Sequence, residues 1–403
     1  MTEWRKVKLG DICSIKSGKR LPKGADFSSC PTENKYIRAR DIKNGVINGE
    51  DLAFISNEVK ERISKYIVNT NDVIVTIAGT IGEVAFVTSQ YDGVNLTENA
   101  IRLTDFDHEV NSKYVFYTLR SNDYYEHMQK IAGGAAQPKM GIYKVEAISI
   151  ALPSVDTQER IVDILSRYDA LIENYQRQIK LLEEAAQRLY KEWFVDLRFP
   201  GHQSTPIING VPKGWEKKKL GDLIELQSGY AFKSSTFESD GKYKIVTIKN
   251  VKDGSFDGDN VSLIKVVPEK MPSHCSLLSG DILLSLTGNV GRVCMMIGDN
   301  FLLNQRVAKL KTNYPTFAYA LFRSHDMFIA VNNLANGAAQ QNVSPIRIAE
   351  LPLTIPPKEL LDSFERIAGR YRVSILKSQT QIRNLSEARD RLLPKLMSGE
   401  IEV

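Results

Sequence analysis

The chain has 403 residues, of which 42% are hydrophobic and 25% charged, a composition typical of a soluble protein with two or three domains. No apolar run approaches the length that crosses a membrane, and the N-terminal stretch MTEWRKVKLGD lacks an apolar signal region, so we expect a cytoplasmic protein with no membrane attachment. Four cysteines without a C-x-x-C pair and five scattered histidines argue against disulfides and against a metal site.

The formal net charge is +5, which is weak support for nucleic-acid binding when taken over the whole chain. The local distribution is more informative, because eleven basic and only four acidic residues lie between Arg5 and Lys43. This excess predicts a patch that engages phosphates. A solvated basic face explains the same charge without a ligand.

The most informative pattern is an internal repeat. Four short motifs recur in the same order, with an offset that drifts from 211 to 203 residues. The matching pairs are Trp4–Asp11 with Trp215–Asp222, Ser17-Gly18 with Ser228-Gly229, Asp41–Gly45 with Asn250–Gly254, and the GAAQ stretches 134–137 and 337–340. The chain is therefore a duplication, in which each copy is a domain followed by a long helix.

Within the first copy, short runs rich in Val and Ile are bounded by Gly, Asn and Asp, a pattern typical of strands. The clearest strands are expected at 73–77, 83–87, 100–103 and 148–152, with short helices at 114–120 and 124–131. This mixture predicts an α+β fold, with two similar domains that each precede a long helix. We divide the chain into domains at 1–152 and 213–355 and helical spacers at 153–212 and 356–403.

The stretch from Val155 to Phe194 has the heptad pattern of a coiled coil. Asp156 followed by Glu159 predicts a capping box at its start. A helix of this length measures about 60 Å, too long for one small domain, so it needs a partner helix. Its seam positions are Ile161, Leu165, Tyr168, Ile172, Tyr175, Ile179, Leu182, Ala186, Leu189 and Trp193.

The partner is expected 203 residues further along the same chain. There the seam contains Ile375, Ile382, Leu385 and Leu392 among eight apolar or alanine positions out of ten; the exceptions are Ser378 and Arg389. Pro394 predicts a shorter or kinked helix. Antiparallel packing of the two helices would give a pseudo-twofold spacer that separates two half-sites on DNA; two ordinary core helices are the alternative.

No catalytic motif is present in the sequence. There is no G-x-x-x-x-G-K-[ST] phosphate loop, and Thr354–Pro357 does not match the tetrad of an amino-methyltransferase. Asp51, Glu58 and Lys60 resemble a nuclease triad only weakly, and a surface turn is the better interpretation. We expect a non-catalytic protein.

The order of these features resembles the specificity subunit of type I restriction-modification systems. The resemblance covers nearly the whole chain and includes Gln158–Ile161, Leu189–Phe194, Phe199–His202 and Arg391–Glu400. It implies two target recognition domains that read the two halves of a bipartite, asymmetric DNA site. The second copy departs from the family where Pro357–Leu361 lacks the usual Glu-Gln pair.

The resemblance also implies partners and cofactors. Two methyltransferase subunits would carry S-adenosylmethionine and the adenine chemistry, and restriction subunits would use ATP and magnesium to translocate and cleave DNA, as in defence against phage. This chain itself would hold no cofactor.

Candidate DNA contacts are physical inferences, because recognition domains vary at base-reading positions. A solvated surface residue is the alternative for each candidate except Gln137 and Gln340, for which the alternative is a loop that closes the domain. In the first domain they are Lys16, Lys19, Arg20, Arg38, Arg40, Lys43 and Gln137; in the second they are Tyr230, Lys233, Lys249, Asn250, Lys252, Asn289 and Gln340. Trp193 and Phe194 are candidates for docking a methyltransferase subunit, with packing under their own linker as the alternative.

Three other functions remain open on sequence alone. A bifunctional type II system uses a similar specificity subunit. A coiled-coil adapter would need no DNA, and a stand-alone enzyme would need an active site without a recognisable motif.

Overall fold

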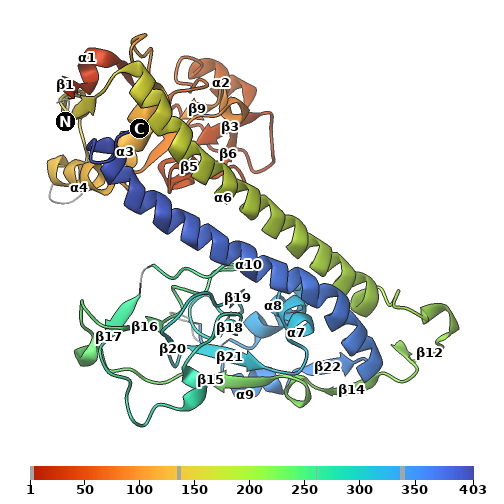
Figure 1. Ribbon diagram of the computed structural model, residues 1–403. Helices are drawn as coiled ribbons and strands as arrows, with labels where there is room; N and C mark the ends of the chain where they lie inside the picture. The colour runs from red at the N-terminus through yellow and green to blue at the C-terminus, as the bar shows by residue number, and fades with distance from the viewer. Residues whose placement is uncertain (1–3, 134–137, 260, 336–340) are drawn as a thin grey trace. The chain divides into compact units, whose positions relative to one another are not determined.

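The computed structural model describes residues 4–133, 138–259, 261–335 and 341–403, and it divides the chain into two compact units. Unit 1 combines residues 1–170 with 385–403, whereas unit 2 is the continuous segment 171–384. The long helices α6 (Val155–Tyr190) and α10 (Lys358–Met397) each contribute one part to each unit (Figure 1). Among the described residues, no helix is both long and apolar enough to span a membrane.

Unit 1 is built on an antiparallel four-stranded sheet with the order β2-β10-β7-β8. It also contains a smaller sheet, β6-β3-β9, and a pair formed by β1 and β11. The strands are β1 (Arg5–Lys8), β2 (Ser14–Ser17), β3 (Asn34–Ile37), β4 (Ile42–Lys43), β5 (Val46–Ile47), β6 (Ala53–Ile55), β7 (Val73–Thr76), β8 (Val84–Phe86), β9 (Asn95–Leu96), β10 (Ala100–Thr104) and β11 (Ser149–Leu152).

The remaining helices of unit 1 are α1 (Leu9–Ile12), α2 (Asn57–Arg62), α3 (Ser112–Arg120), α4 (Asn122–Ile131) and α5 (Ile142–Glu146). One face of the main sheet is covered by α3, whose Phe116 ring lies 5.8 Å from that of Phe86 on β8. The core of this unit continues into the long helices, because Leu165 of α6 and Leu396 of α10 belong to the same buried cluster.

Unit 2 repeats this architecture, with an antiparallel sheet of order β15-β21-β18-β19 and a β17-β16-β20 sheet. Its strands are β12 (Ile207–Ile208), β13 (Val211–Pro212), β14 (Glu216–Lys219), β15 (Glu225–Ser228), β16 (Tyr243–Val246), β17 (Ser262–Ile264), β18 (Ile282–Ser285), β19 (Val293–Met295), β20 (Phe301–Leu303), β21 (Val307–Lys311) and β22 (Pro352–Ile355). Its other helices are α7 (Pro315–Phe322), α8 (His325–Asn333) and α9 (Pro345–Ala349). The predicted α+β duplication is confirmed.

In each unit, an arginine at the C-terminal end of the first helix that covers the sheet lies against a turn that contains a glycine. An added Cβ on Gly45 (φ 87°) would lie 2.8 Å from the guanidinium of Arg120, and one on Gly254 (φ 76°) would lie 2.9 Å from that of Arg323. Both glycines have a backbone conformation that other residues rarely adopt. The backbone conformation therefore favours glycine at both equivalent turns, and the flexible end of an arginine lies against each one.

The two long helices run antiparallel within each unit. In unit 1, Asp169 of α6 bonds to Arg389 near the end of α10, and in unit 2, Trp193 just after α6 packs on Phe364 near the start of α10. Every predicted seam position is buried or half-buried, and Ile161, Leu165, Ile172, Ile375 and Leu396 are at most 8% exposed.

Two details of the helix ends differ from the sequence predictions. The predicted cap at Asp156 is wrong, because Ser154 precedes the helix and its hydroxyl accepts a 3.4 Å hydrogen bond from the amide of Thr157. The shorter second helix is also wrong, since α10 continues through Pro394 to Met397. Pro394 lies in the last turn, so its missing amide removes only one bond, to the preceding turn, and three helical residues follow it.

Candidate nucleic-acid interface

A cleft of about 710 Å³ opens in unit 1 between the segment that follows β2, the end of α2 and the segment that leads into α5. Its floor is partly apolar, and its rim carries most of the charge. The lining residues are Ser17, Gly18, Lys19, Arg20, Leu21, Pro22, Lys23, Arg62, Ile63, Tyr66, Ile77, Glu98, Lys139, Met140, Gly141 and Ile142.

The cleft is basic, because its lining includes five cations, Lys19, Arg20, Lys23, Arg62 and Lys139, and one acidic residue, Glu98. All five cations are exposed at the surface. The pair between Arg20 and Glu98 is loose, at 3.7 Å. An excess of solvated cations around a concave surface is the electrostatic pattern expected of a phosphate-binding face.

An aromatic ring lies among these charges. The ammonium of Lys19 sits 5.5 Å from the centre of the Tyr66 ring, a geometry that suits a cation–π contact. Tyr66 is half-buried and lines the cleft together with Leu21 and Ile63. A ring and apolar side chains under a basic rim offer surfaces for both the sugar or base and the phosphate of a nucleotide.

The backbone fixes the entrance of the cleft at Gly18. An added Cβ there would lie 2.1 Å from the carbonyl oxygen of Thr97, so no larger residue fits without moving the strand. The amide of Lys19 donates to the carbonyl of Leu96 at 2.8 Å, and the Tyr36 hydroxyl donates to the carbonyl of Lys19 at 2.6 Å. Burial raises the pKa of Tyr36 to about 12, so this hydroxyl keeps its proton.

Unit 2 builds the same entrance with different side chains. Gly229 takes the place of Gly18, since its added Cβ would lie 2.3 Å from the carbonyl oxygen of Asn304. Next along the chain, Tyr230 and Phe232 form a ring pair with centroids 5.2 Å apart, where unit 1 has Lys19 and Leu21. The two units therefore present different chemistry on a shared backbone.

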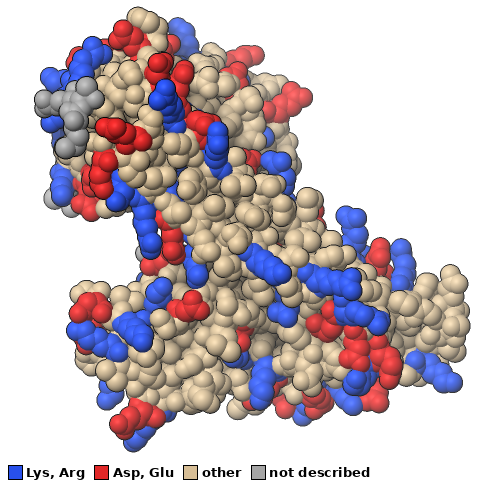
Figure 2. Space-filling model, viewed as in Figure 1, with Lys and Arg blue, Asp and Glu red and all other residues tan. Residues whose placement is uncertain are grey.

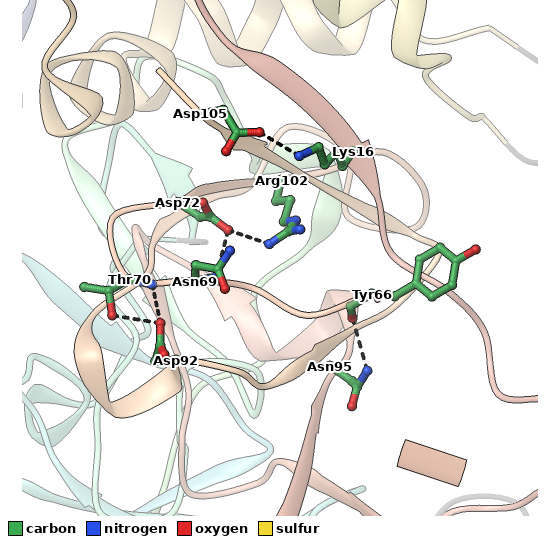
Figure 3. A network of polar contacts seen from close by, with 9 residues as sticks. All are labelled: Lys16, Tyr66, Asn69, Thr70, Asp72, Asp92, Asn95, Arg102 and Asp105. Carbon is green, nitrogen blue, oxygen red and sulfur yellow. Dashed lines mark hydrogen bonds and ion pairs between the residues drawn. The ribbon is translucent and has the colours of Figure 1, made fainter. Parts of the chain in front are cut away.

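The charged sheet face of unit 1 explains one of the predicted DNA contacts differently. The ammonium of Lys16 on β2 lies 2.6 Å from Asp105 (Figure 3), and both side chains remain at least half exposed. Nearby, the carboxylate of Asp72 accepts from the amide of Asn69 at 2.8 Å and from Arg102 at 3.1 Å, within the sheet. Lys16 therefore already has an anionic partner, whereas Lys19 and Arg20 face the cleft.

Asn250 is a correction, because it is buried inside a turn, and Arg38 is also bonded within a turn. The guanidinium of Arg38 binds both oxygens of the buried Asp41 at 2.9 Å, which leaves the Arg38 side chain 19% exposed. Asn250 is completely buried, and its side-chain oxygen accepts from the amide of Thr247 at 2.8 Å. Asn250 is therefore not free to contact DNA, whereas a DNA contact from the partly exposed Arg38 stays a prediction.

The two turns are equivalent. Asp41 aligns with Asn250, and each residue's carbonyl accepts from an amide seven residues later, that of Asn48 or Asp257. The repeated motif is therefore a turn signature, which Asp and Asn satisfy by bonding to nearby backbone amides.

The other predicted contacts are on the surface. Arg40 and Lys43 of unit 1 and Lys233, Lys249 and Asn289 of unit 2 are exposed, while Lys252 is half-buried and lies 3.8 Å from Asp257. Gln137 and Gln340 lie outside the described residues. On the face drawn in Figure 2, basic and acidic side chains are interspersed over each unit, so the local excess in the cleft is the stronger signal.

Trp193 and Phe194 are not surface docking residues. Trp193 is 6% exposed, and the Phe194 ring lies 4.9 Å from Phe317 and 5.1 Å from Phe364 in the core of unit 2. Their burial against α7 and α10 agrees with the alternative of internal packing. A large aromatic side chain at a helix end favoured an interface, but rings of unit 2 in the same chain provide the partner surface.

Four residues that line the cleft were not among the predicted contacts: Lys23, Arg62, Tyr66 and Lys139. Lys23 lies within the basic stretch from Arg5 to Lys43 and was detectable there. Arg62, Tyr66 and Lys139 reach the cleft only through the fold, since they come from separate parts of the chain.

Catalytic alternatives gain no support from the geometry. The ammonium of Lys60 donates to the carbonyl of Gly93 at 2.5 Å, and Glu58 is 4.0 Å from Arg62, so the weak nuclease-like set is engaged elsewhere. Within the described part of the chain, no three His, Cys, Asp or Glu residues are grouped to hold a metal ion.

A chain with two similar α+β units, one of which has a basic cleft, has the features of a duplicated nucleic-acid-binding protein. The family model described as the type I restriction modification DNA specificity domain matches residues 1–184 and again 212–368, so the chain belongs to this family. The resemblance seen in the sequence is confirmed, and the function is DNA recognition within a type I restriction-modification system.

Among curated proteins, the chain is similar to two specificity subunits from Methanocaldococcus jannaschii. It is 28% identical over 316 residues to that of the type I restriction enzyme MjaIX, covering 73% of this chain and 70% of that protein. It is 25% identical over 418 residues to that of MjaVIII, covering 100% and 93%. The crystal structure of a type I restriction-modification S subunit from M. genitalium has the same fold, with a TM-score of 0.58, 16% identity and coverage of 98% and 96%.

Proposed function

We propose that each unit reads one half of a bipartite, asymmetric site on double-stranded DNA. The basic cleft of unit 1 is the observation that carries this proposal, because five exposed cations surround it. The unlike residues at the equivalent entrance of unit 2, Tyr230 and Phe232 in place of Lys19 and Leu21, support half-sites of different sequence.

The chain would act without catalysis of its own, in the cytoplasm, as the scaffold for two methyltransferase subunits and for restriction subunits. In this arrangement the methyltransferase partners bind S-adenosylmethionine, and the restriction partners bind ATP and magnesium. This chain would bind none of these groups. Outside the cleft, the buried ion pair of Asp72 with Arg102 fits structural rather than catalytic use.

Selection of bound duplexes from a random DNA pool tests the proposal. The full chain would be copurified with a candidate methyltransferase subunit, and the selection run at a stated salt concentration, because phosphate contacts depend on salt. We expect two unlike short motifs at a fixed separation. A single continuous motif would contradict reading by two units, and no enrichment would favour a protein adapter.

A matched pair of variants assigns the contribution of unit 1. Substituting Lys19 and Arg20 together by alanine should weaken selection of one half-site while the other motif is still enriched. The control replaces the exposed Lys65, which lies outside the cleft. Equal loss of both motifs would show that the cleft does not read one half of the site.

A further inference from the structure

Each unit exposes one large apolar side chain at the same place in its fold. Tyr143 on α5 is 68% exposed, and Ile346 on α9 is 75% exposed. They are 203 residues apart, the same offset that relates the two long helices. Leaving a large apolar side chain in water gives up roughly 1.5–3 kcal/mol of burial, so its repetition in two units points to a use.

The short helices that carry these residues are rigidly held in matching ways. The segment before each helix is tied to the end of a central strand, since Met140 donates its amide to Ile77 and Val343 donates to Leu286, at 2.9 and 3.0 Å. On the inner side of the helices, Val145 and Ile348 are completely buried.

A close backbone approach holds each helix from the other side. An added Cβ on Gly10 would lie 3.0 Å from the Glu146 side chain, and one on Gly221 would lie 3.0 Å from that of Ala349. Tyr143 and Ile346 therefore project from fixed platforms, and a rigid support is what an inserting side chain requires.

The surroundings of Tyr143 favour nucleic acid. Its ring folds over Gly141, whose added Cβ would lie 2.6 Å from the ring, and Gly141 and Ile142 line the basic cleft. Lys139 lies on the same segment and also lines the cleft. Tyr143 is the large apolar side chain that α5 exposes, and its exposed neighbours are the acidic Glu146 and the small Ala147. A docking site for a protein would present a wider apolar patch.

We propose that Tyr143 and Ile346 are wedges that press into the base stack of the duplex held by their own unit and partly unstack one base step. This inference rests on the proposed function. Apolar side chains inserted between base steps bend DNA and are independent of base-edge hydrogen bonds. Such a wedge would explain why the two units keep an apolar residue here while their polar residues differ.

The test uses the full chain with its methyltransferase subunit and a duplex that contains the selected site, with 2-aminopurine placed at successive steps. We expect the fluorescence of 2-aminopurine to rise at one step in each half-site when the wild-type complex binds. Tyr143→Ala should abolish the rise in one half-site only and raise Kd roughly tenfold, the scale of one base–aromatic stacking interaction. Ile346→Ala should abolish the rise in the other half-site and weaken binding, without the loss of an aromatic stacking interaction.

Control variants separate insertion from general loss of apolar surface. Val46→Ala in unit 1 and Val266→Ala in unit 2 remove side chains that are 62% and 77% exposed, and both should bind and unstack DNA as the wild type does. Tyr143→Phe and Ile346→Leu keep a wedge and should retain the signal. The salt dependence of binding should not change in any of these variants, because every cation that faces a phosphate is still present.

The outcomes also separate this inference from the proposed function. If the wild-type complex selects no DNA site, the proposed function fails before the wedge is tested. If it binds its site and the two alanine variants unstack the same steps with the same affinity, the wedge is wrong and DNA recognition stands. If these variants lose the methyltransferase subunit during gel filtration while their residual DNA binding is unchanged, the positions dock a protein and the wedge is also wrong.

Discussion

Arg389 of α10 donates to Asp169 of α6 across a distance of 2.6 Å, at a heptad position that the sequence pattern marks as an exception. Arg120 at the end of α3 lies 3.4 Å from the same carboxylate, and the hydroxyl of Tyr117 donates to it at 2.7 Å. One carboxylate thus connects both long helices to the recognition domain of unit 1.

Replacing Asp169 by asparagine should destabilise unit 1. The two arginine side chains, 10% and 15% exposed, would keep their charges and repel each other without the carboxylate between them. Removing one partner from a buried ion pair costs roughly 3–5 kcal/mol. Because Asp169 is still 29% exposed, we expect the unfolding free energy to fall by the lower end of this range, about 3 kcal/mol. Urea unfolding of the full chain measures the loss.

Asp163→Asn is the matched control, because Asp163 pairs with Arg167 on the exposed face of the same helix. That pair should contribute less than about 0.5 kcal/mol. Equal destabilisation by the two variants would show that the buried network has no special role.

The same network predicts a dependence of stability on pH. Burial raises the pKa of Asp169, but the charges of Arg120 and Arg389 and the bond from Tyr117 outweigh it, so the pKa lies below its usual value. The stabilisation is therefore complete above the unfolded-state pKa of about 3.9 and is lost as the pH falls through the lower folded-state pKa. The difference in unfolding free energy between the wild type and Asp169→Asn should shrink below about pH 4; a constant difference down to pH 2 would contradict it.

Substituting alanine for glycine should lower the stability of the fold at Gly18 and Gly229 and raise it at Gly369. Gly18→Ala and Gly229→Ala should destabilise their units by roughly 3 kcal/mol or more, because the added carbon meets a backbone carbonyl that cannot move independently. Gly369→Ala should stabilise unit 2 by about 0.5–1 kcal/mol, since this position is inside α10 and the nearest atom would be 3.6 Å away. Thermal unfolding distinguishes the signs, and a stable Gly18→Ala variant would contradict the close approach.

The four cysteines should react at very different rates. Cys30 is exposed, whereas Cys275 and Cys294 are buried. Burial, helped by Asp107 and Asp105, raises the pKa of Cys13 to about 12, and burial also raises the pKa of Cys275 and Cys294, so little reactive thiolate forms at pH 8. Titration with a disulfide reagent should give one fast thiol per chain and three more after unfolding, and Cys30→Ser should remove the fast phase.

The basic cleft predicts how DNA affinity depends on salt. Replacing Arg62 or Lys139 by alanine should weaken binding to all sequences and reduce the slope of log K against log salt by about one for each cation that no longer pairs with a phosphate. Lys65→Ala should leave the slope unchanged, because Lys65 is exposed outside the cleft. A change in base preference with an unchanged slope would instead indicate that the cleft residue contacts a base.

The sequence predicted the elements whose signals are local. Heptad spacing identified α6 and α10, and the repeated motifs identified the duplicated α+β domain, because periodic burial is written into neighbouring residues. Arg389 was recognised only as a break in the pattern, since its partners Asp169 and Tyr117 are distant in the sequence. Only part of the cleft was predicted. Lys19 and Arg20 lie in a basic stretch of the sequence, whereas Arg62 and Lys139 come from distant parts of the chain and are brought to the cleft by folding.

Charge alone did not reveal that Arg38 binds Asp41 within a turn. The choice between a solvated, a paired and a ligand-facing arginine depends on which acidic group the fold brings near. That proximity is not encoded in the composition of a short segment.

The discontinuity of unit 1 has a consequence for the order in which a newly made chain folds. Leu393 and Leu396 complete a core whose other residues come from the first 170, and the ribosome makes them last. Unit 2 is one uninterrupted segment and is finished earlier. During synthesis, the core of unit 1 therefore stays incomplete, with part of its apolar surface exposed to water, until after unit 2 has been made and can fold.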